Sequence, residues 1–281
     1  MRRLLVTGGS GYLGSDLARR AVAAGWNVVA TYHTTRPELP GAELVPLDLR
    51  DGPGAERAIA ELRPDCIIHT AYVQSGPDLR AVTVDGTAAV ARAAAALGAR
   101  LVHLSSDVVF DGEREGAYTE ADPPAPISPY GEAKADAERL VSRYTPDALI
   151  VRTSLIYGGE RPSKHEQLAL DAAAGRVEIA FYTDEMRCPI AVGDLASALL
   201  ELALLDVRGP LHVAGADAVS RYEFARLVVL AAGGPAEVLQ SALSAGSAAR
   251  RPRNCVLDSS RAQRLVRTRL RGVREVLRPP A

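Results

Sequence analysis

The chain is poor in several residue types on which whole classes of protein depend. It has three cysteines, Cys66, Cys188 and Cys255, and only two of its 33 basic residues are lysines. Three isolated cysteines cannot form a disulfide framework, and they indicate reduced thiols in a cytosol. The five histidines are scattered without the spacing of metal ligands, so we expect no structural metal site.

Long apolar runs and a strong net charge are also lacking. No stretch is apolar enough to span a bilayer, and we find no signal peptide or lipidation motif, so we expect a cytoplasmic protein without membrane contact. The net charge is −1, although ten arginines gather between residues 250 and 278. Basic surfaces that bind single-stranded nucleic acid usually interleave aromatic residues, and none follows Phe224. We therefore expect no nucleic-acid partner but a solvated arginine-rich face, one residue of which could hold a substrate phosphate.

A glycine-rich turn stands near the N-terminus. The apolar run Arg2–Thr7 predicts a buried parallel strand, and Ser15–Ala24 predicts a helix. Between them, glycines at a Gly-x-x-Gly-x-x-Gly spacing allow a tight turn that brings the backbone and a helix N-terminus close to a pyrophosphate. The segment predicts a dinucleotide site, with these cofactor-binding residues: Gly8, Ser10, Gly11, Tyr12, Leu13 and Gly14.

The second predicted strand, Trp26–Tyr32, bears on which dinucleotide binds. Sites that prefer NAD usually place a carboxylate about 20 residues after the glycine turn, bonded to the ribose 2′-hydroxyl. This chain has His33 there, then Arg36, and no carboxylate before Glu38. We therefore expect NADPH, with His33 and Arg36 near its 2′-phosphate. NADH remains the alternative, in which case Arg36 only begins a solvated loop.

Tyr130 and Lys134 lie four residues apart in the segment Ser-Pro-Tyr-Gly-Glu-Ala-Lys. Serine followed by proline is typical of a helix start, and residues four apart share one face of a helix. A nearby cation and the positive end of the helix would favour the phenolate and lower the pKa of the tyrosine. Because arginine is the usual cation of this chain, a lysine here indicates that a compact ammonium is needed.

Strands and helices alternate along the first 158 residues. This alternation, with nearly continuous apolar strands, predicts a Rossmann-type, doubly wound parallel α/β sheet. We expect residues 1–158 to form the dinucleotide-binding core, 188–213 to return to it, and 159–187 with 214–281 to form a smaller substrate-binding region. Beyond the elements named above, the predicted strands are 42–46, 66–70, 100–105, 148–153, 177–181 and 210–213. The predicted helices are 54–62, 79–97, 129–143, 166–174, 192–205 and 221–232.

Several motifs together resemble the extended short-chain dehydrogenase/reductase superfamily. These are Thr7-Gly8-x-x-Gly11-x-x-Gly14, Asp48-Leu49 and Tyr130-x-x-x-Lys134. The segments 104–112 (Leu-Ser-Ser-Asp-Val-Val-Phe-Asp-Gly), 118–122, 129–131, 152–158 and 212–215 more narrowly resemble the dTDP-4-dehydrorhamnose reductase family. The resemblance covers about residues 3 to 275.

The resemblance implies roles for individual residues. Ser106 would hydrogen-bond the substrate carbonyl, Tyr130 would donate a proton as hydride arrives, and Lys134 would bind the nicotinamide ribose. Ser105 is an alternative to Ser106. Further contacts implied by position are Asp48 and Leu49 near the adenine, Ala71 along the cofactor channel, and Asp107 and Arg187 near the substrate.

Two positions depart from the family pattern. Thr83 stands where an asparagine is usual, which puts the proton relay attributed to that asparagine in doubt. The segment Asp184–Pro189 introduces Glu185 and Arg187 where the rhamnose-forming enzymes have Gln and Gly. The charge near the sugar therefore differs, and the substrate need not be the rhamnose precursor.

The favoured function is NADPH-dependent reduction of a carbonyl, most simply the 4-keto group of a nucleotide-linked deoxysugar. A 4,6-dehydratase is disfavoured because Asp107 is followed by Val108 rather than by a second acid. A nucleotide-sugar epimerase remains open, since it would use the same Tyr and Lys. So does a regulatory or redox-sensor protein that binds NAD(P) without turnover. The helices 79–97 and 129–143 are a candidate homodimer face.

Overall fold

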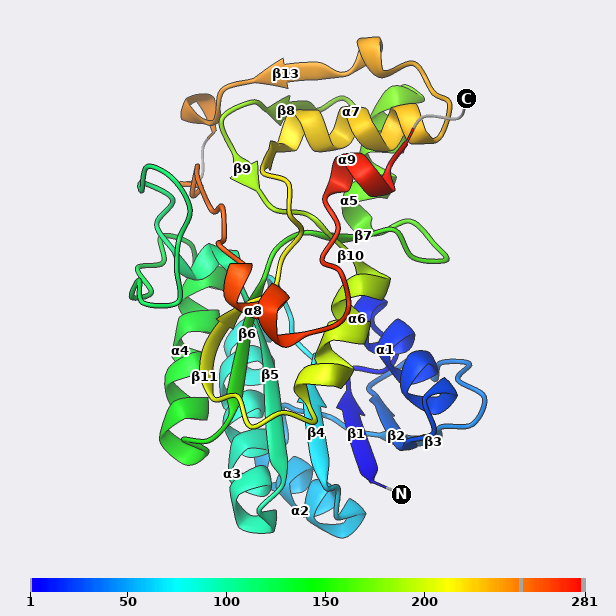
Figure 1. The fold of residues 1–281 in the computed structure, drawn as a ribbon, viewed down its shortest axis with the longest axis vertical. Coiled ribbons are helices and arrows are strands. Elements are labelled where there is room, and N and C mark those ends of the chain that lie inside the picture. Colours follow the sequence, from blue (N-terminus) through cyan, green and yellow to red (C-terminus); the bar gives the residue numbers. More distant parts are fainter. Residues whose placement is uncertain (1, 248–249, 279–281) are drawn as a thin grey trace.

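The computed structural model describes residues 2–247 and 250–278, and its centre is a parallel sheet of seven strands (Figure 1). The strands lie in the order β11-β6-β5-β4-β1-β2-β3, and all neighbours are parallel. The chain builds outward from β1 in one direction and then from β4 in the other, so the predicted doubly wound sheet is confirmed. The strands are β1 (Arg3–Thr7), β2 (Asn27–Tyr32), β3 (Glu43–Pro46), β4 (Cys66–His69), β5 (Arg100–Ser106), β6 (Leu149–Thr153) and β11 (Gly209–His212).

Helices cover both faces of this sheet (Figure 1). Successive strand residues point to opposite faces of the sheet, so Leu4 belongs to one buried cluster and Leu5 to another. One face carries α1 (Tyr12–Ala23) and α6 (Val192–Leu202). The other carries α2 (Gly52–Leu62), α3 (Thr87–Leu97) and α4 (Pro129–Tyr144), with a π-helical turn, η1 (Ala81–Gly86), just before α3.

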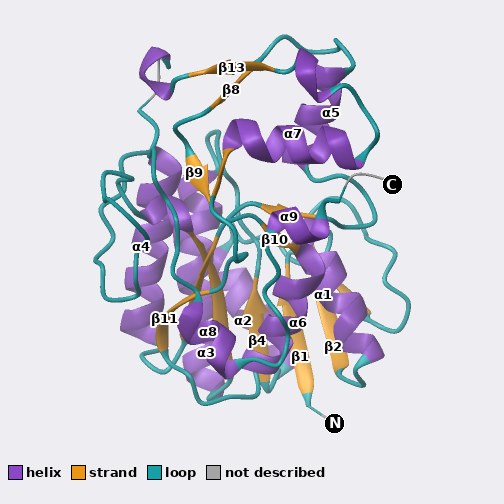
Figure 2. Cartoon of the chain, turned by 45° about the horizontal axis from the view of Figure 1, so that its top comes forward, coloured by secondary structure: helices purple, strands orange, loops and turns teal. Residues whose placement is uncertain are grey.

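A smaller region lies beyond the carboxyl ends of the strands (Figure 2). It has its own buried cluster, to which Tyr157, Phe181 and Phe224 contribute. Its helices are α5 (Lys164–Ala173), α7 (Arg221–Ala231) and α9 (Val273–Val276). Its short strand pairs are β7 (Ile156–Tyr157) with β10 (Ile190–Ala191), β9 (Met186–Arg187) with β12 (Val219–Ser220), and β8 (Ala180–Tyr182) with β13 (Gln240–Ala242). Single 3₁₀ turns are η2 (Asp107–Val109), η3 (Ala236–Val238) and η4 (Ser244–Gly246).

The chain passes between the two regions more than once. After β10 it returns to the sheet through α6 and β11. Helix α8 (Ser260–Leu265) also packs beside β11, so Ala262, Val266 and Leu270 join the main core although the sequence places them within 214–281. Among residues 2–247 and 250–278, no helix has the length and apolarity needed to cross a membrane.

Serine caps fix where the helices around the crevice begin. Ser128 Oγ accepts the N–H of Gly131 at 3.2 Å, and Pro129 follows as the first residue of α4. Ser163 caps α5 in a reciprocal capping box with Glu166. Ser220 caps α7 by accepting the N–H of Glu223. These caps set the positions of the side chains in the first turns, several of which point into the crevice.

Candidate active site

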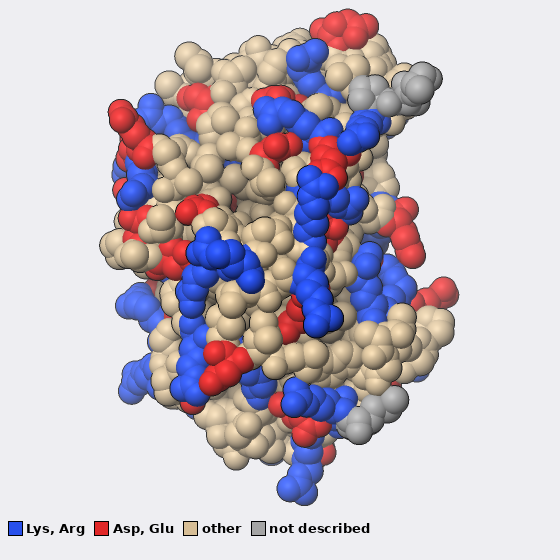
Figure 3. Space-filling model, viewed as in Figure 1, with Lys and Arg blue, Asp and Glu red and all other residues tan. Residues whose placement is uncertain are grey.

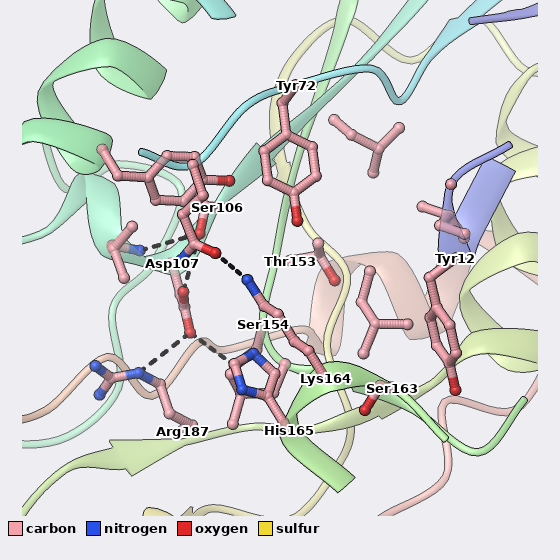
Figure 4. A pocket seen from close by; sticks show the side chains of 18 of the residues that line it. Tyr12, Tyr72, Ser106, Asp107, Thr153, Ser154, Ser163, Lys164, His165 and Arg187 are labelled. Atoms are coloured by element: carbon pink, nitrogen blue, oxygen red, sulfur yellow. Dashed lines mark hydrogen bonds and ion pairs between the residues drawn. The ribbon is translucent and has the colours of Figure 1, made fainter. Parts of the chain in front are cut away.

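A cavity of about 510 Å³ lies between the carboxyl ends of the sheet strands and the smaller region. Ligands of doubly wound sheets bind at this edge, where the strand order reverses. Four elements of the sheet contribute: the turn after β1, the loop after β4, and the ends of β5 and β6 (Figure 4). The lining includes Gly11–Gly14, Thr70, Tyr72, Gln74, residues 104–108, Tyr130, Lys134, residues 153–156 and 161–165, Glu185, Arg187, Arg221 and Arg251.

Lys134 lies on α4, one turn after Tyr130, with 3% of its surface exposed. Its ammonium donates to the carbonyl oxygen of Leu104 at 2.8 Å. Burial lowers the pKa of Lys134 to about 8, against the opposing effect of the Glu138 carboxylate. A cation so placed can hold hydroxyl groups of a bound ribose.

The pKa of the Tyr130 phenol differs from the lowered value that the sequence led us to expect. Burial raises its pKa well above the ordinary value, and the nearby Tyr72 and Asp107 add to that effect. Ser106 acts in the opposite direction as a hydrogen-bonding neighbour, whereas Lys134 is not among the groups that shift this pKa. The predicted lowering of the pKa is therefore wrong for this structure. The phenol is protonated near neutral pH, which is the form that a proton donor requires.

The two serines at the end of β5 serve opposite faces of the sheet. Ser106 Oγ donates to Asp107 Oδ1 at 3.1 Å, on the side of the cavity. Ser105 Oγ donates to Glu138, a buried carboxylate of α4 that also accepts three hydrogen bonds from Arg152. Both serines line the cavity, but the hydroxyl of Ser105 is engaged by Glu138 of α4.

Asp107 and Arg187, expected near the substrate, lie together. Asp107 is 3% exposed and accepts a hydrogen bond from Ser154 at 2.7 Å. The Nε atom of Arg187 lies 3.7 Å from Asp107 Oδ2 (Figure 4). Burial raises the pKa of Asp107, and the Arg187 guanidinium offsets this in part. Arg187 also donates to the carbonyls of Met186, Pro252 and Arg253, so it links three segments of the chain.

The glycine-rich turn has the geometry of an anion site. Gly8 has φ +72°, a left-handed conformation that favours glycine. A Cβ on Gly14 would lie 2.1 Å from the carbonyl oxygen of Gly8, so α1 approaches this turn too closely for any side chain. No side chain caps α1 at Gly11, which leaves its first N–H groups facing the cavity. The backbone of Ala71 lies within 3.0 Å of where a Cβ of Gly8 would be.

Two other residues of that turn hold it in place. The hydroxyl of Tyr12 accepts the N–H of Gly159 at 2.8 Å and donates to Glu166 at 3.3 Å, so it ties the turn to α5. Leu13 is buried in the core beside the turn. Ser10 and Gly8 are not among the residues that line the cavity.

The residues expected at the adenosine end lie at the carboxyl ends of β2 and β3, outside the cavity lining. Asp48 forms a bidentate pair with Arg50, whose guanidinium lowers the pKa of Asp48 to about 2. Arg50 also contacts His33 Nε2 at 3.0 Å. Leu49 is buried, and Arg36 is exposed. Sequence reasoning missed Arg50, although it directly follows the Asp-Leu pair.

Sequence reasoning missed Tyr72 and left the role of Thr83 in doubt. The ring of Tyr72 lies 5.7 Å from that of Tyr130 and 5.0 Å from the Lys134 ammonium. The hydroxyl of Thr83 accepts the N–H of Val73 at 3.0 Å and donates to its carbonyl at 2.8 Å. Thr83, which lies within the π-helical turn η1, therefore anchors the loop that carries Tyr72. Its hydroxyl is occupied by backbone groups rather than directed at Lys134.

The far end of the cavity is basic. Arg161, Lys164, Arg187, Arg221 and Arg251 line it, against the two acids Asp107 and Glu185. Glu185 is fully buried and pairs with Arg251. Sequence reasoning named Asp107, Glu185 and Arg187 individually, and Arg251 only as one of the ten C-terminal arginines. The others come from segments far apart in the chain, and nothing in their local sequence marks them.

A parallel doubly wound sheet with a glycine turn after β1 and a Tyr/Lys pair facing the crevice defines a Rossmann-type protein with the side chains of a dehydrogenase/reductase. The chain belongs to the RmlD substrate binding domain family, whose model matches residues 1–279.

Individual relatives fall into two kinds. A protein of Haloferax volcanii named probable low-salt glycan biosynthesis reductase Agl14 is 34% identical, covering 91% of this chain and 89% of its own. Methionine adenosyltransferase 2 subunit beta of Rattus norvegicus is 31% identical, covering 99% and 88%. Among solved structures, dTDP-4-dehydrorhamnose reductase from Bacillus anthracis in complex with NADP has a TM-score of 0.83 and 26% identity, covering 98% and 96%.

Proposed function

We propose that the protein is an NADPH-dependent reductase that acts on the 4-keto group of a nucleotide-linked deoxysugar. The observation that carries this proposal is the convergence of Ser106, Tyr130 and Lys134 on one cavity, beside a glycine turn in which a Cβ on Gly14 would clash with the backbone. Those features fit a dinucleotide whose pyrophosphate meets the N-terminus of α1.

A reduced nicotinamide, when bound beside Lys134, would supply the hydride for the carbonyl carbon. Tyr130 donates its phenolic proton to the carbonyl oxygen, so that the ketone becomes a secondary alcohol. Ser106 donates a hydrogen bond to the same oxygen while negative charge develops there. Lys134 binds hydroxyls of the nicotinamide ribose. The Tyr130 phenolate that remains takes up a proton before the next turnover.

The charge of the residues near the expected adenosine end of the cofactor favours NADPH over NADH. No carboxylate lies between the end of β2 and Glu38, and Arg36 is exposed beside His33. The structure of a relative with NADP bound is consistent with this choice. The basic end of the cavity suits an anionic substrate such as a sugar linked to a nucleoside diphosphate. Homodimer formation and a cytoplasmic location stay predictions.

The first experiment follows NADPH absorbance while the protein is mixed with a panel of nucleotide-linked 4-keto-6-deoxysugars. Tyr130→Phe should lower kcat by at least about a hundredfold, because the general acid is lost. Ser106→Ala should also lower kcat, whereas Ser105→Ala, its matched control, should affect mainly stability through Glu138. Near-normal turnover of Tyr130→Phe would show that another group donates the proton.

A regulatory role is the second candidate, since a methionine adenosyltransferase subunit is 31% identical over almost the whole chain. A regulatory protein would bind NADPH without oxidising it in the presence of any panel member. An epimerase would convert substrate without net consumption of NADPH. The same absorbance assay, with product analysis, therefore separates the three functions.

A further inference from the structure

Three cations at the basic end of the cavity lack acidic partners in the described part of the chain: Arg161, which is exposed, Lys164 and Arg221. Lys164 and Arg221 both line the cavity. Within the described ranges, neither forms an ion pair, and each has a neutral partner instead. The ammonium of Lys164 donates to the side-chain oxygen of Gln74, and Nη2 of Arg221 lies 3.2 Å from Nδ1 of His165. Burial and the surrounding cations lower the pKa of His165 to about 3, so this ring is uncharged.

The other two arginines at this end of the cavity are compensated. Arg251 pairs with the buried carboxylate of Glu185, and Arg187 lies 3.7 Å from Asp107 and 3.9 Å from Glu185. Their charges are therefore largely balanced by the protein itself. Lys164 and Arg221, together with the exposed Arg161, carry the positive charge that is left over.

The positions of Lys164 and Arg221 add to the excess of positive charge in this part of the cavity. Lys164 is the first residue of α5, and Arg221 is the first residue of α7. A helix N-terminus carries partial positive charge, which disfavours a cation and favours an anion. Both helices begin at the cavity and pack against each other, so two cations and two helix N-termini meet in one place. An anion there would be attracted by both cations, while Glu166 and Glu223 in the first turns offset part of the helix charge.

We propose that Lys164 and Arg221 form the subsite for the diphosphate group of the substrate, with Lys164 exchanging its neutral partner Gln74 for a phosphate oxygen. This inference rests on the proposed function and adds to it the residues that bind the anion. The location fits, because the pair Asp107–Arg187 connects this end of the cavity to Ser106. A sugar bound at Ser106 would thus have its diphosphate directed toward α5 and α7.

Calorimetry with dTDP as the probe tests the subsite. Saturating NADP⁺ is present throughout, so that the pyrophosphate of the dinucleotide already fills the glycine turn. Lys164→Gln and Arg221→Gln should each weaken dTDP binding about tenfold or more, because each removes a charge-assisted hydrogen bond. Lys164→Arg should restore most of the affinity. Arg226→Gln removes an equal charge from an exposed position on α7 and should leave the affinity unchanged. Unchanged NADP⁺ affinity shows that each variant is folded.

Normal dTDP affinity in both glutamine variants would overturn the proposal, and loss of affinity only in Arg251→Gln would place the anion on the Glu185 side instead. No binding of dTDP to the unmodified protein would also overturn it. Failure of the proposed function would look different. In that case dTDP would bind as expected, but no carbonyl compound would be reduced.

A second measurement needs no variant. The chain has two lysines, and Lys134 is buried, so an amine-reactive reagent should label Lys164 before Lys134. Mass spectrometry should show that dTDP slows the labelling of Lys164 at least several-fold, while thymidine, which lacks phosphate, does not. Equal labelling with and without saturating dTDP would contradict the assignment.

Discussion

At the scale of single residues, Lys134 is a charged side chain held almost entirely out of water. Its ammonium has one direct acceptor, the Leu104 carbonyl, and burial lowers its pKa from 10.5 to about 8. The folded protein binds this proton less tightly than the unfolded chain, so the charge costs stability below pH 8. The cost is relieved as the pH rises from about 8 to 10.5. The pKa difference of 2.5, between 10.5 and 8, makes this cost in stability about 3 kcal/mol at most.

Lys134→Met should therefore stabilise the fold while it abolishes reduction. We expect a gain of about 2 kcal/mol at pH 7, since the lost hydrogen bond removes about 1 kcal/mol of the benefit. The gain should shrink by about 2 kcal/mol at pH 9.5, where the wild-type lysine is mostly neutral in the folded state. Urea unfolding at the two pH values measures both quantities. A destabilised variant, or a gain independent of pH, would show that the ammonium is better compensated than burial indicates.

The sequence predicted which residues gather at the site more reliably than it predicted their chemistry. The spacing of Tyr130 and Lys134 was enough to place both on one helix face, because helix geometry is local. The pKa of Tyr130 depends on Tyr72 and Asp107, and that of Lys134 on Glu138 and on burial. Glu138 lies on α4 itself and opposes the shift of Lys134, whereas burial, the main cause of both shifts, comes from tertiary packing. Spacing alone therefore could not give the direction of either pKa shift.

At the scale of elements, the close contact between α1 and the glycine turn makes this part of the fold sensitive to substitution. A Cβ on Gly14 would lie 2.1 Å from a backbone oxygen, which cannot move aside as a flexible side chain can. Gly14→Ala should therefore lower the free energy of unfolding by about 1–3 kcal/mol and weaken NADPH binding. Gly246→Ala is the control, because a Cβ there meets nothing within 4 Å. Urea unfolding compares them, and equal stability would show that α1 can shift.

Sequence patterns predicted the long elements and missed the short ones. The strands and helices of the main sheet have strong local signals, namely apolar runs and serine or proline caps. Two-residue strands such as β9 and β12 exist because distant segments pair, Val219 with Arg187 for example, and no local pattern marks them. The predicted helix 79–97 is continuous in sequence pattern, yet it contains the π-helical turn at which Thr83 bonds Val73.

At the scale of the whole molecule, charge is balanced over the surface and unbalanced in the cavity. Basic and acidic side chains lie beside one another over the face in Figure 3. Several of the C-terminal arginines expected on a solvated face form ion pairs, such as Arg274 with Glu223 and Arg269 with Glu275. Arg251 instead lines the cavity. Composition gave the net charge of −1 but could not show that six cations and two acids share one pocket, because these residues are far apart in sequence.

This distribution predicts how the reaction responds to salt. Screening shortens the range of electrostatic attraction from about 10 Å at 0.1 M salt to about 3 Å at 1 M. With NADPH saturating, the KM for an anionic nucleotide-sugar should rise about fivefold between 0.05 and 0.5 M salt, while kcat stays constant because bound substrate is already in contact with the cations. The double variant Lys164→Gln/Arg221→Gln should show a higher KM and a flatter salt dependence. If the KM of the wild-type protein did not change with salt, the basic end of the cavity would not be attracting the substrate. Its cations would then serve only to hold α5, α7 and β9 together.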